Sequence, residues 1–375
     1  MPQTTARQKL LSSVRSIVVK IGTNVVTRDD GQLDKPAVRR LADQIAELRR
    51  RELHVTVVSS GAIGAGVSQL RLGVRPKNMA LLQAAAAVGQ PALMNIFDAA
   101  LSRHRLRAAQ MLLTRADFED RRRYLNVRNT LGALHQFGTV PIVNENDTVA
   151  VDEIRYGDND ILAALLTNLL RADLLVILTV VDGLIRNGEV VELVERIDES
   201  IRRAATSATS ALGTGGMDTK LRAAKMVTDA GETVLIANGR TRNILPRLLA
   251  GALLGTVFVP TRAKMTSRKR WIALAVRPAG QVVVDDGAAA ALRKGGKSLL
   301  PIGVIAARGR FERGEVVRVV DATGQPIAQG MVNYGVAELR KIKGLRSDQL
   351  AQAVGGACRD EVIHRNNLVL IAGGQ

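Results

Sequence analysis

The stretch Ser16-Ile-Val-Val-Lys-Ile-Gly-Thr-Asn24 decides how the first two thirds of the chain are interpreted. Its first six residues form a short, β-branched apolar run, which predicts a strand buried in a parallel sheet. Lys20 lies near the end of this run, followed by Gly22 and Thr23. Glycine lets the backbone approach an anion, threonine offers a hydroxyl and an N–H group, and lysine supplies positive charge. The stretch therefore predicts a phosphate site, with a surface lysine beside an ordinary turn as the alternative.

Alternating strands and helices continue from this strand to about residue 260. Gly89 and Pro91 mark where one long helix would be interrupted. The alternation predicts an α/β fold, a three-layer αβα sandwich whose mostly parallel sheet is covered by helices on both faces. Ligands of such sheets bind beyond the carboxyl ends of the strands, where polar and glycine-rich segments follow in this chain. The apolar runs predict strands at 16–21, 55–59, 110–114, 140–143, 174–179, 233–237 and 256–260, and the helical spacing predicts helices at 34–51, 78–102, 121–136, 159–170, 220–230 and 243–249.

A second glycine-rich segment, Ser59-Ser-Gly-Ala-Ile-Gly-Ala-Gly66, follows the strand at 55–59. Glycines between a strand and a helix leave backbone N–H groups free to bind an anion. The order of its glycines is G-x-x-G-x-G, which differs from the dinucleotide-binding fingerprint G-x-G-x-x-G and argues against a nicotinamide cofactor. The alternative is a tight turn that only serves helix packing.

Two clusters of acids and amides follow predicted strands or precede predicted helices: Asn144-Glu-Asn-Asp147 and Gly157-Asp-Asn-Asp160. A carboxylate can take the ammonium group of a zwitterionic substrate, while asparagine and backbone N–H groups take its acid oxygens. Carboxylates also suit Mg²⁺, which prefers oxygen ligands and substrate phosphates. A solvated loop with a helix cap is the alternative.

A third glycine-rich segment, Gly213-Thr-Gly-Gly-Met-Asp-Thr-Lys220, precedes a predicted helix. Free N–H groups at a helix start favour anions, and Lys220 adds a positive charge. The segment lacks the Gly-Lys-Ser/Thr triplet of a Walker A loop. A flexible loop is the alternative interpretation.

Taken together, these segments favour phosphoryl transfer. Two lysine-bearing glycine sites and two acid–amide clusters lie at strand ends of one predicted sheet. Such catalysis rests on positioning and charge stabilisation, with lysines and Mg²⁺ neutralising the transferred group. The four histidines belong to no catalytic constellation, and we interpret each as structural or exposed.

Composition bounds the remaining possibilities. The chain has 375 residues, enough for two domains, with 2% aromatic residues, so the core must be aliphatic. Its single cysteine, Cys358, excludes an intrachain disulfide. No apolar run precedes Ile17, and the apolar stretch 174–181 is too short to cross a bilayer. We therefore expect a cytoplasmic protein without a membrane segment.

The pattern changes after residue 260. Residues 261–270 are polar and basic, and short β-rich runs between turns follow from residue 280, which predicts a compact barrel-like domain with one helix at 286–294. Of the net charge of +18, residues 261–375 contribute +10, from 19 basic and nine acidic residues. Nucleic-acid binding is one interpretation of this charge. High arginine usage throughout a basic proteome is the other.

At this point the motifs resemble those of a known family. The segments VVKIGTN, VVSSGAIGAG, QMLLTRADFEDRRRYLN, PIVNENDTVA, YGDNDILAAL and GTGGMDTKLRAA are similar to those of the glutamate 5-kinase family, which has the amino-acid kinase fold. The stretch from about residue 280 to 370 resembles a PUA domain. The resemblance implies a kinase domain at 1–260, a linker at 261–279 and a PUA domain at 280–375.

The resemblance also implies the roles of individual residues. It makes Lys20, Lys220 and Asp160 the catalytic residues, with both lysines on the migrating phosphoryl group and Asp160 holding them. The substrate L-glutamate would bind Ser60, Asn144, Asp147 and Asn159. ATP would bind Lys20, Gly22, Thr23, Thr179, Val180, Thr214, Gly215, Gly216, Met217, Asp218, Thr219 and Lys220.

The implied reaction moves the γ-phosphoryl group of MgATP onto the side-chain carboxylate of L-glutamate, the first step of proline biosynthesis. A carboxylate is already a nucleophile, so no general base is required. One departure from the family is Val180, where an aspartate usually follows Leu-Thr; another is Ile185, where the family often has tyrosine. The family also implies a homo-oligomer, either a dimer or a tetramer.

Two alternatives stay open on the sequence alone. A related kinase of the same fold would act on carbamate, aspartate or a nucleotide. An RNA-binding or regulatory protein would use the basic C-terminal region, although only Trp271, Phe311 and Tyr334 are available there for base stacking.

Overall fold

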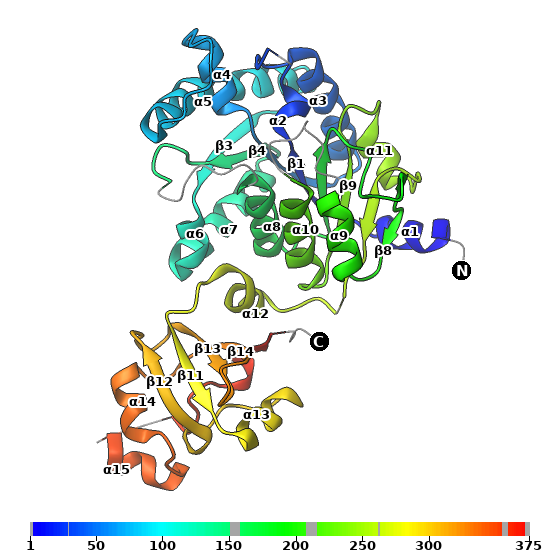
Figure 1. Cartoon of the computed structure of the whole chain (residues 1–375). Helices are drawn as coiled ribbons and strands as arrows, with labels where there is room; N and C mark the ends of the chain where they lie inside the picture. The colour runs from blue at the N-terminus through cyan, green and yellow to red at the C-terminus, as the bar shows by residue number, and fades with distance from the viewer. Residues whose placement is uncertain are drawn as a thin grey trace. The chain divides into compact units, whose positions relative to one another are not determined.

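The computed structural model describes residues 3–28, 30–150, 158–207, 216–261, 263–354 and 359–371. The chain divides into two compact units. The first comprises Met1–Asp117 and Arg121–Lys264, and the second comprises Phe118–Asp120 and Met265–Gln375 (Figure 1).

The first unit is built on an eight-stranded sheet with the order β3-β4-β2-β1-β5-β9-β10-β8. Neighbouring strands from β3 to β9 are parallel, β10 is antiparallel to β9, and the edge strand β8 is parallel to β10. The predicted α/β fold with a mostly parallel sheet is confirmed. The strands are β1 (Ser16–Ile21), β2 (His54–Ser59), β3 (Ala108–Leu113), β4 (Val140–Glu145), β5 (Leu174–Thr179), β8 (Leu193–Val194), β9 (Thr233–Asn238) and β10 (Thr256–Phe258), beside a separate hairpin of β6 (Ile185–Arg186) and β7 (Glu189–Val190).

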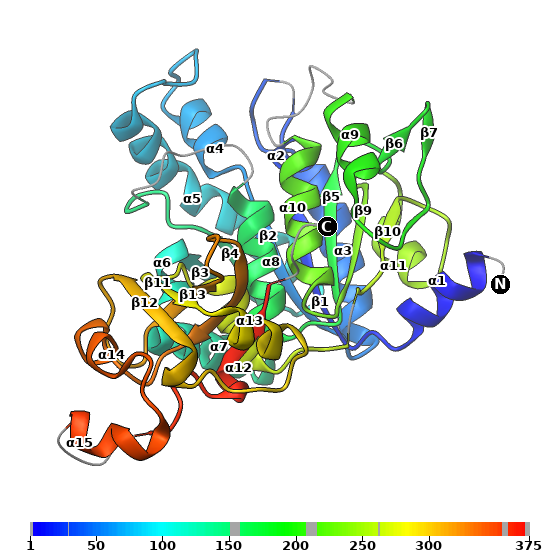
Figure 2. The same cartoon turned by 60° about the horizontal axis from the view of Figure 1, so that its bottom comes forward.

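Helices cover both faces of this sheet. On one face α3, α5 and α11 pack against alternate residues of the strands, Ile17, Val19 and Ile21 among them. On the other face α8 packs against β1 and α10 packs beside α8 (Figure 2). The helices are α1 (Gln3–Ser12), α2 (Thr23–Val26), α3 (Lys35–Arg50), α4 (Ala62–Gln69), α5 (Met79–Ser102), α6 (Arg115–Glu119), α7 (Arg121–Gln136), α8 (Asp158–Leu170), α9 (Glu199–Ser207), α10 (Met217–Thr228) and α11 (Ile244–Leu249).

Strand register brings the carboxyl ends of the central strands to one edge. Ile21 at the end of β1 pairs with Ser59 of β2 and with Leu178 of β5. On the neighbouring pair, Thr179 of β5 is opposite Asn238 of β9. The polar segments that follow these strands therefore start from the same edge of the sheet, as ligand binding in an open α/β sheet requires.

The long helix α5 runs through Gly89 and Pro91 without interruption, contrary to the expectation from sequence. Gly89 serves helix packing: a Cβ atom there would lie 1.9 Å from the carbonyl oxygen of Ala62 on α4. The reciprocal contact is as close, since a Cβ atom on Gly66 would lie 1.7 Å from the carbonyl oxygen of Ala85. The two helix backbones thus touch through glycine.

Among the described residues, α5 is also the one helix that is long and apolar enough to span a membrane. Its buried residues, Leu93 and Phe97 among them, belong to the core cluster of the first unit. Packing within the core accounts for the buried apolar residues of this helix, while Leu81 and Val88 are exposed.

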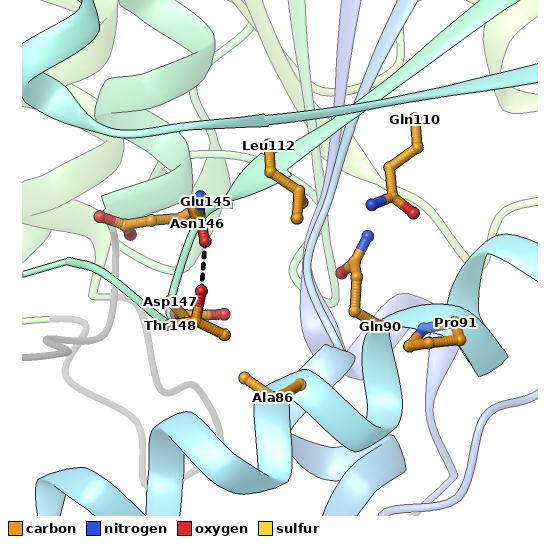
Figure 3. Close-up of a pocket in the computed structure, with 10 residues that line it drawn as sticks. Ala86, Gln90, Pro91, Gln110, Leu112, Glu145, Asn146, Asp147 and Thr148 are labelled. Carbon is orange, nitrogen blue, oxygen red and sulfur yellow. Dashed lines mark hydrogen bonds between the residues drawn. The ribbon is translucent and has the colours of Figure 1, made fainter.

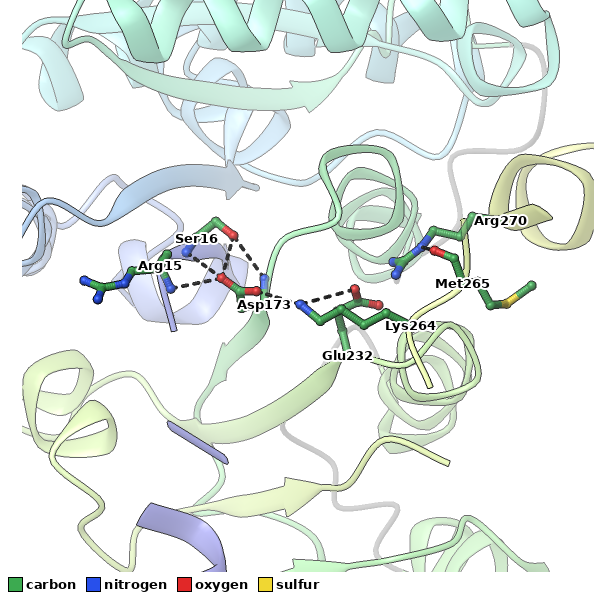
Figure 4. A network of polar contacts seen from close by, with 7 residues as sticks. All are labelled: Arg15, Ser16, Asp173, Glu232, Lys264, Met265 and Arg270. Carbon is green, nitrogen blue, oxygen red and sulfur yellow. Dashed lines mark hydrogen bonds and ion pairs between the residues drawn. The ribbon is translucent and has the colours of Figure 1, made fainter. Parts of the chain in front are cut away.

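A network of hydrogen bonds and ion pairs fixes the opposite edge of the sheet, where β1 and β5 begin (Figure 4). Asp173, just before β5, accepts from the backbone N–H groups of Arg15 and Ser16 at 2.9 and 3.0 Å and from Lys264 Nζ at 2.7 Å. Lys264 also lies 3.9 Å from the buried carboxylate of Glu232. Burial alone would raise the pKa of Asp173, but these donors outweigh it and lower the pKa. The start of β1 is thereby tied to the end of the first unit.

The second unit contains a five-stranded mixed sheet with the order β12-β11-β13-β14-β15. In the part of the chain that the structure describes, β12 and β15 are its edge strands. The predicted β-rich C-terminal domain is confirmed, whereas α14 and β15 were not predicted. Its elements are α12 (Ser267–Arg270), the π-helix η1 (Trp271–Ala275), β11 (Gly280–Val284), α13 (Asp286–Arg293), η2 (Pro301–Gly303), β12 (Val304–Gly309), β13 (Val316–Val320), β14 (Pro326–Met331), α14 (Val336–Ile342), η3 (Ser347–Gln349), α15 (Leu350–Val354), η4 (Arg365–Asn367) and β15 (Leu368–Leu370).

The end of the polar segment 261–270 and the residue that follows it are less exposed than the sequence suggests. Arg270 is buried and donates from Nε to the carbonyl of Met265 at 2.9 Å (Figure 4). Trp271 is also buried, and its indole N–H donates to the carbonyl of Phe118 at 3.0 Å within the same unit. This hydrogen bond ties residues 118–120 to the second unit.

The close contact between α4 and α5 yields a stability prediction. Gly66→Ala should lower the free energy of unfolding by about 1–3 kcal/mol or more, because the new methyl group meets backbone atoms that cannot turn aside. Gly132→Ala, in the exposed middle of α7 with open space around it, is the matched control. It should leave stability unchanged or raise it by about 0.5–1 kcal/mol. Urea unfolding of both variants measures the difference, and equal stabilities would contradict the packing argument.

Candidate active site

Lys20 and Asp160 form the centre of the site. Lys20 lies on β1 at the position that alternates with the core-facing Val19 and Ile21, so its side chain lies on the α8 side of the sheet. Asp160 lies in the first turn of α8 and is completely buried. The Lys20 Nζ atom is 2.7 Å from Asp160 Oδ1. Strand alternation and the start of one helix thus bring the two charges together.

Lys220 reaches the same carboxylate from α10. Its Nζ atom is 3.2 Å from Asp160 Oδ2, and the hydroxyl of Thr219 donates to that oxygen at 3.1 Å. The carbonyl of Gly216 lies 2.9 Å from the same hydroxyl oxygen, so the one hydroxyl hydrogen of Thr219 is shared between these two acceptors. Each oxygen of Asp160 therefore carries one lysine, and both lysines are nearly buried.

Among the side chains that the structure describes, Lys20 and Lys220 share the one carboxylate of Asp160. With both lysines protonated, these three described groups carry a net positive charge in a mostly buried place. Burial raises the pKa of Asp160, but Lys20 and Lys220 outweigh that effect and lower it. Burial is also the largest influence on Lys220 and lowers its pKa, assisted by Lys20 and opposed by Asp160. A buried cluster with excess positive charge is suited to receive an anion.

The turn after β1 approaches the cluster closely. The N–H group of Gly22 donates to the carbonyl of Leu178 at 2.9 Å, so it is used inside the sheet and cannot bind an anion. A Cβ atom on Gly22 would lie 3.1 Å from that carbonyl and 4.0 Å from Lys20 Nζ. Thr23 begins α2, and the carbonyl of Asn24 accepts from Arg240 at 2.9 Å. Gly22 therefore keeps space open beside Lys20.

A row of polar side chains adjoins the charged cluster. Asn159, next to Asp160, donates from Nδ2 to Ser60 Oγ at 2.7 Å and to Asn144 Oδ1 at 3.0 Å. Asn144 is buried at the end of β4 and donates from Nδ2 to Gln90 Oε1 at 2.9 Å. Gly61, with a φ of 115° that favours glycine, turns the chain from β2 into α4 beside Ser60.

Gln90, at the end of this row, lines a cavity of about 240 Å³ between α5, β3 and the segment after β4 (Figure 3). Gln90 and Gln110 point toward each other from α5 and β3, and Asp147 lies across the cavity from them (Figure 3). Of the predicted substrate residues, the structure thus joins Ser60, Asn144 and Asn159 in one row and places Asp147 in the adjoining cavity.

The structure describes most, but not all, of the remaining residues that were predicted to bind the nucleotide. The carbonyl of Thr179 accepts from Gly239 N at 2.8 Å. The apolar side chain of Val180 packs against the core. Gly216 caps α10, and Met217, Asp218 and Thr219 form its first turn. The predicted residues Thr214 and Gly215 lie outside the described residues, as does Cys358.

Three polar residues in this region were missed from the sequence: Gln90, Asn238 and Arg240. Asn238 ends β9 and donates to Asp182 Oδ1 at 3.0 Å, and its own side-chain oxygen accepts from the N–H of Arg240. The sequence did contain a signal for Asn238 and Arg240, because both are polar and lie at or just after the end of a buried strand, at the same edge as Lys20. Gln90 had a weaker signal, a single amide in an alanine-rich helix.

Comparison with known proteins identifies the class. Residues 15–238 match the amino acid kinase family, and residues 280–354 match the PUA domain. The first match spans more than half of the chain, so the chain belongs to the amino acid kinase family.

The most similar relatives narrow this further. A glutamate 5-kinase from Caldanaerobacter subterraneus subsp. tengcongensis is 45% identical over 96% of this chain and 98% of that protein. The glutamate 5-kinases from Geobacter sulfurreducens and Geobacter metallireducens are 45% and 46% identical, over 97% of this chain and 100% of each relative. Within the amino acid kinases, the chain belongs to the glutamate 5-kinase family.

The charged cluster yields a pH prediction. Asp160→Asn should lower the free energy of unfolding by about 3–5 kcal/mol at neutral pH, because it leaves Lys20 and Lys220 buried without a counter-charge. The pKa of Asp160 is lower in the folded chain, so its stabilisation is present above the unfolded-state pKa of about 3.9. It is lost as the pH falls through the folded-state pKa. The difference between wild type and variant should therefore narrow in acid.

Urea unfolding at several pH values measures this difference. Asp198→Asn, which changes a carboxylate with no burial, is the matched control and should alter stability far less. A difference that stays constant from neutral to acid pH would show that Asp160 does not stabilise the fold through its charge.

Proposed function

We propose that this chain transfers the γ-phosphoryl group of ATP to the side-chain carboxylate of L-glutamate, giving L-glutamyl 5-phosphate in the first step of proline biosynthesis. Relatives named glutamate 5-kinase cover nearly the whole chain at about 45% identity. The observation that carries the proposal is the convergence of Lys20 and Lys220 on Asp160.

Charge stabilisation by the two lysines is the core of the proposed mechanism. Negative charge on a phosphoryl group in transfer is spread over its equatorial oxygens, and fixed cations neutralise it. We assign this role to Lys20 and Lys220, with Asp160 as the residue that positions both. Both oxygens of Asp160 are engaged by lysines, so it is not assigned as a base. The acceptor is a carboxylate and needs none.

The row of amides and the adjoining cavity are assigned to L-glutamate. Asp147 would take the ammonium group, and Ser60, Asn144 and Asn159 would bind and orient the acceptor. Support comes from Asn159 and Asp160 being consecutive in α8, which puts the amide row directly beside the phosphoryl-handling lysines.

The nucleotide is assigned to the other side of the lysines. Gly22 would leave space for it, and Thr23, Thr179 and Val180 would border it. The start of α10 would bind its phosphates, with residues 214–220 as the nucleotide loop. Because Val180 has no carboxylate, Asp182, held by Asn238, is the nearest acidic side chain after β5.

Mg²⁺ is proposed to enter as the chelate of ATP. Magnesium is commonly held by one or two carboxylates together with substrate phosphates. Among the described residues no three histidine, cysteine or acidic side chains are grouped for metal binding. Asp160 is not assigned as a Mg²⁺ ligand, because its two oxygens contact Lys20 and Lys220.

Cytoplasmic localisation, a homo-oligomer and RNA binding by the C-terminal unit stay predictions. They rest on the sequence and on the family resemblance. A steep loss of RNA affinity with added salt would be the signature of phosphate-driven binding.

The proposed mechanism predicts the effect of removing one lysine. Lys220→Met should lower kcat by about 100-fold or more, since loss of one fixed donor to transition-state charge costs that much. Lys225→Met is the matched control on the same helix. Lys225 pairs with Asp229 and is partly exposed, so kcat should change little. The assay supplies MgATP and L-glutamate with hydroxylamine, which traps the acyl phosphate as a hydroxamate.

Substrate identity is tested in the same assay. Hydroxamate formed from aspartate but not glutamate, or ADP release with carbamate alone, would assign the chain a different acceptor. Equal kcat values for wild type and Lys220→Met would remove Lys220 from the mechanism while leaving the substrate assignment intact.

A further inference from the structure

The orientation of the amide row is fixed by one backbone group. The N–H of Glu145 donates to Asn144 Oδ1 at 2.9 Å, and a backbone N–H can only donate. Asn144 must therefore present Nδ2 to Gln90, and Gln90 must present Oε1 to Asn144. By the same logic Asn159 presents Nδ2 to Asn144 and keeps Oδ1 on its other side. The direction of every amide in the row follows from Glu145.

This arrangement leaves one polar atom at each end of the row. Gln90 is 7% exposed, and its Nε2 atom is buried with no hydrogen-bond partner in the described part of the chain. Asn159 Oδ1 is likewise buried without a partner among the residues described. A buried amide donor without an acceptor is destabilising, and a bound ligand that supplies an acceptor would remove this cost.

Gln90 lines the cavity together with acidic residues on the opposite wall. Glu145 and Asp147 come from the end of β4 and the segment after it, while Gln90 comes from α5 (Figure 3). A ligand with one cationic and one anionic group would place its cation against the acids and its anion against the amide donor. The α-ammonium and α-carboxylate of an amino acid are such a pair.

We propose that Gln90 is a specificity-determining residue that donates Nε2–H to the α-carboxylate of the acceptor amino acid, while its Oε1 holds Asn144 in place. This inference rests on the proposed function, because it takes L-glutamate as the acceptor. It adds a binding residue on α5 to the substrate residues at the strand ends. Gln90 acts on recognition of the α-carbon end, far along the substrate from the carboxylate that reacts.

Two variants test the role of the free donor. Gln90→Glu keeps an oxygen toward Asn144 and replaces the free N–H by an oxygen that repels a carboxylate. Gln90→Met keeps the volume and removes both polar atoms. Each should lower kcat/KM for L-glutamate by about 10- to 100-fold, the value of a hydrogen bond to a charged group. The loss should fall mainly on KM for L-glutamate, with KM for ATP unchanged. Assays at pH 8 keep the introduced glutamate ionised.

A trimmed substrate separates recognition from a merely structural role. 4-Aminobutanoate keeps the ammonium group and the reacting carboxylate but lacks the α-carboxylate. The preference for L-glutamate over 4-aminobutanoate, as a ratio of kcat/KM values, should fall at least about 10-fold in both variants. If both substrates lose activity equally, Gln90 acts only through Asn144, and the inference is overturned.

The matched control is Gln83→Glu, two turns earlier on α5. Gln83 lies outside the cavity lining and donates to the carbonyl of Ala150 at 3.3 Å. The Gln83→Glu variant adds the same charge to the same helix as Gln90→Glu, and it should leave the substrate preference unchanged. A fall in preference as large as that of Gln90→Glu would assign the effect to general charge and overturn the inference. Failure of the proposed function is distinct, because wild type itself would then form no glutamyl hydroxamate.

Discussion

The site depends on one carboxylate that two lysines share. Asp160 is completely buried, so its charge costs free energy unless cations compensate it, and Lys20 and Lys220 do so from two other elements. The strand, α8 and α10 are therefore held in mutual position by an electrostatic requirement in addition to apolar packing. Two described lysines beside one described carboxylate differ from a simple ion pair, and a bound anion would add negative charge to the group.

The first turn of α8 connects the two halves of the site. Asn159 belongs to the amide row that runs to Gln90, and its neighbour Asp160 holds the lysines. Consecutive helix residues point about 100° apart, so one short turn serves both a polar pocket and an ion cluster. In the proposed mechanism, alignment between acceptor and phosphoryl donor therefore depends on the geometry of a single helix start.

Much of this arrangement could be predicted from the sequence, and the reasons are physical. Buried strands in a parallel sheet are continuous apolar runs, so β1 and β5 were predicted with their observed bounds. Lys20 stood out because it lies near the end of such a run, with Gly22 and Thr23 directly after it. By contrast, the pairing of Lys20 with Asp160 came from the family resemblance, because no local spacing links residues so distant. The two-residue strands β6 to β8 are too short to carry a periodic signal.

Gln90 was missed for a different reason. In an alanine-rich helix one amide looks like an ordinary solvent-facing residue, and its meaning appears only when β4 brings Asn144 beside it. Val180 was recognised from the sequence as a departure from the family pattern. That its side chain packs against the core could be seen only in the structure.

The backbone contact between α4 and α5 constrains how this pocket can evolve. Gly89 adjoins Gln90, and with Gly66 it leaves no room for the two helices to slide or to accept a larger residue. The α5 wall is thus closely packed, whereas the facing wall is β3, which in the described part of the chain is an edge strand of the sheet. Substitutions that change the size of the pocket should therefore accumulate at Gln110 and Leu112, while Gly66 and Gly89 stay unchanged.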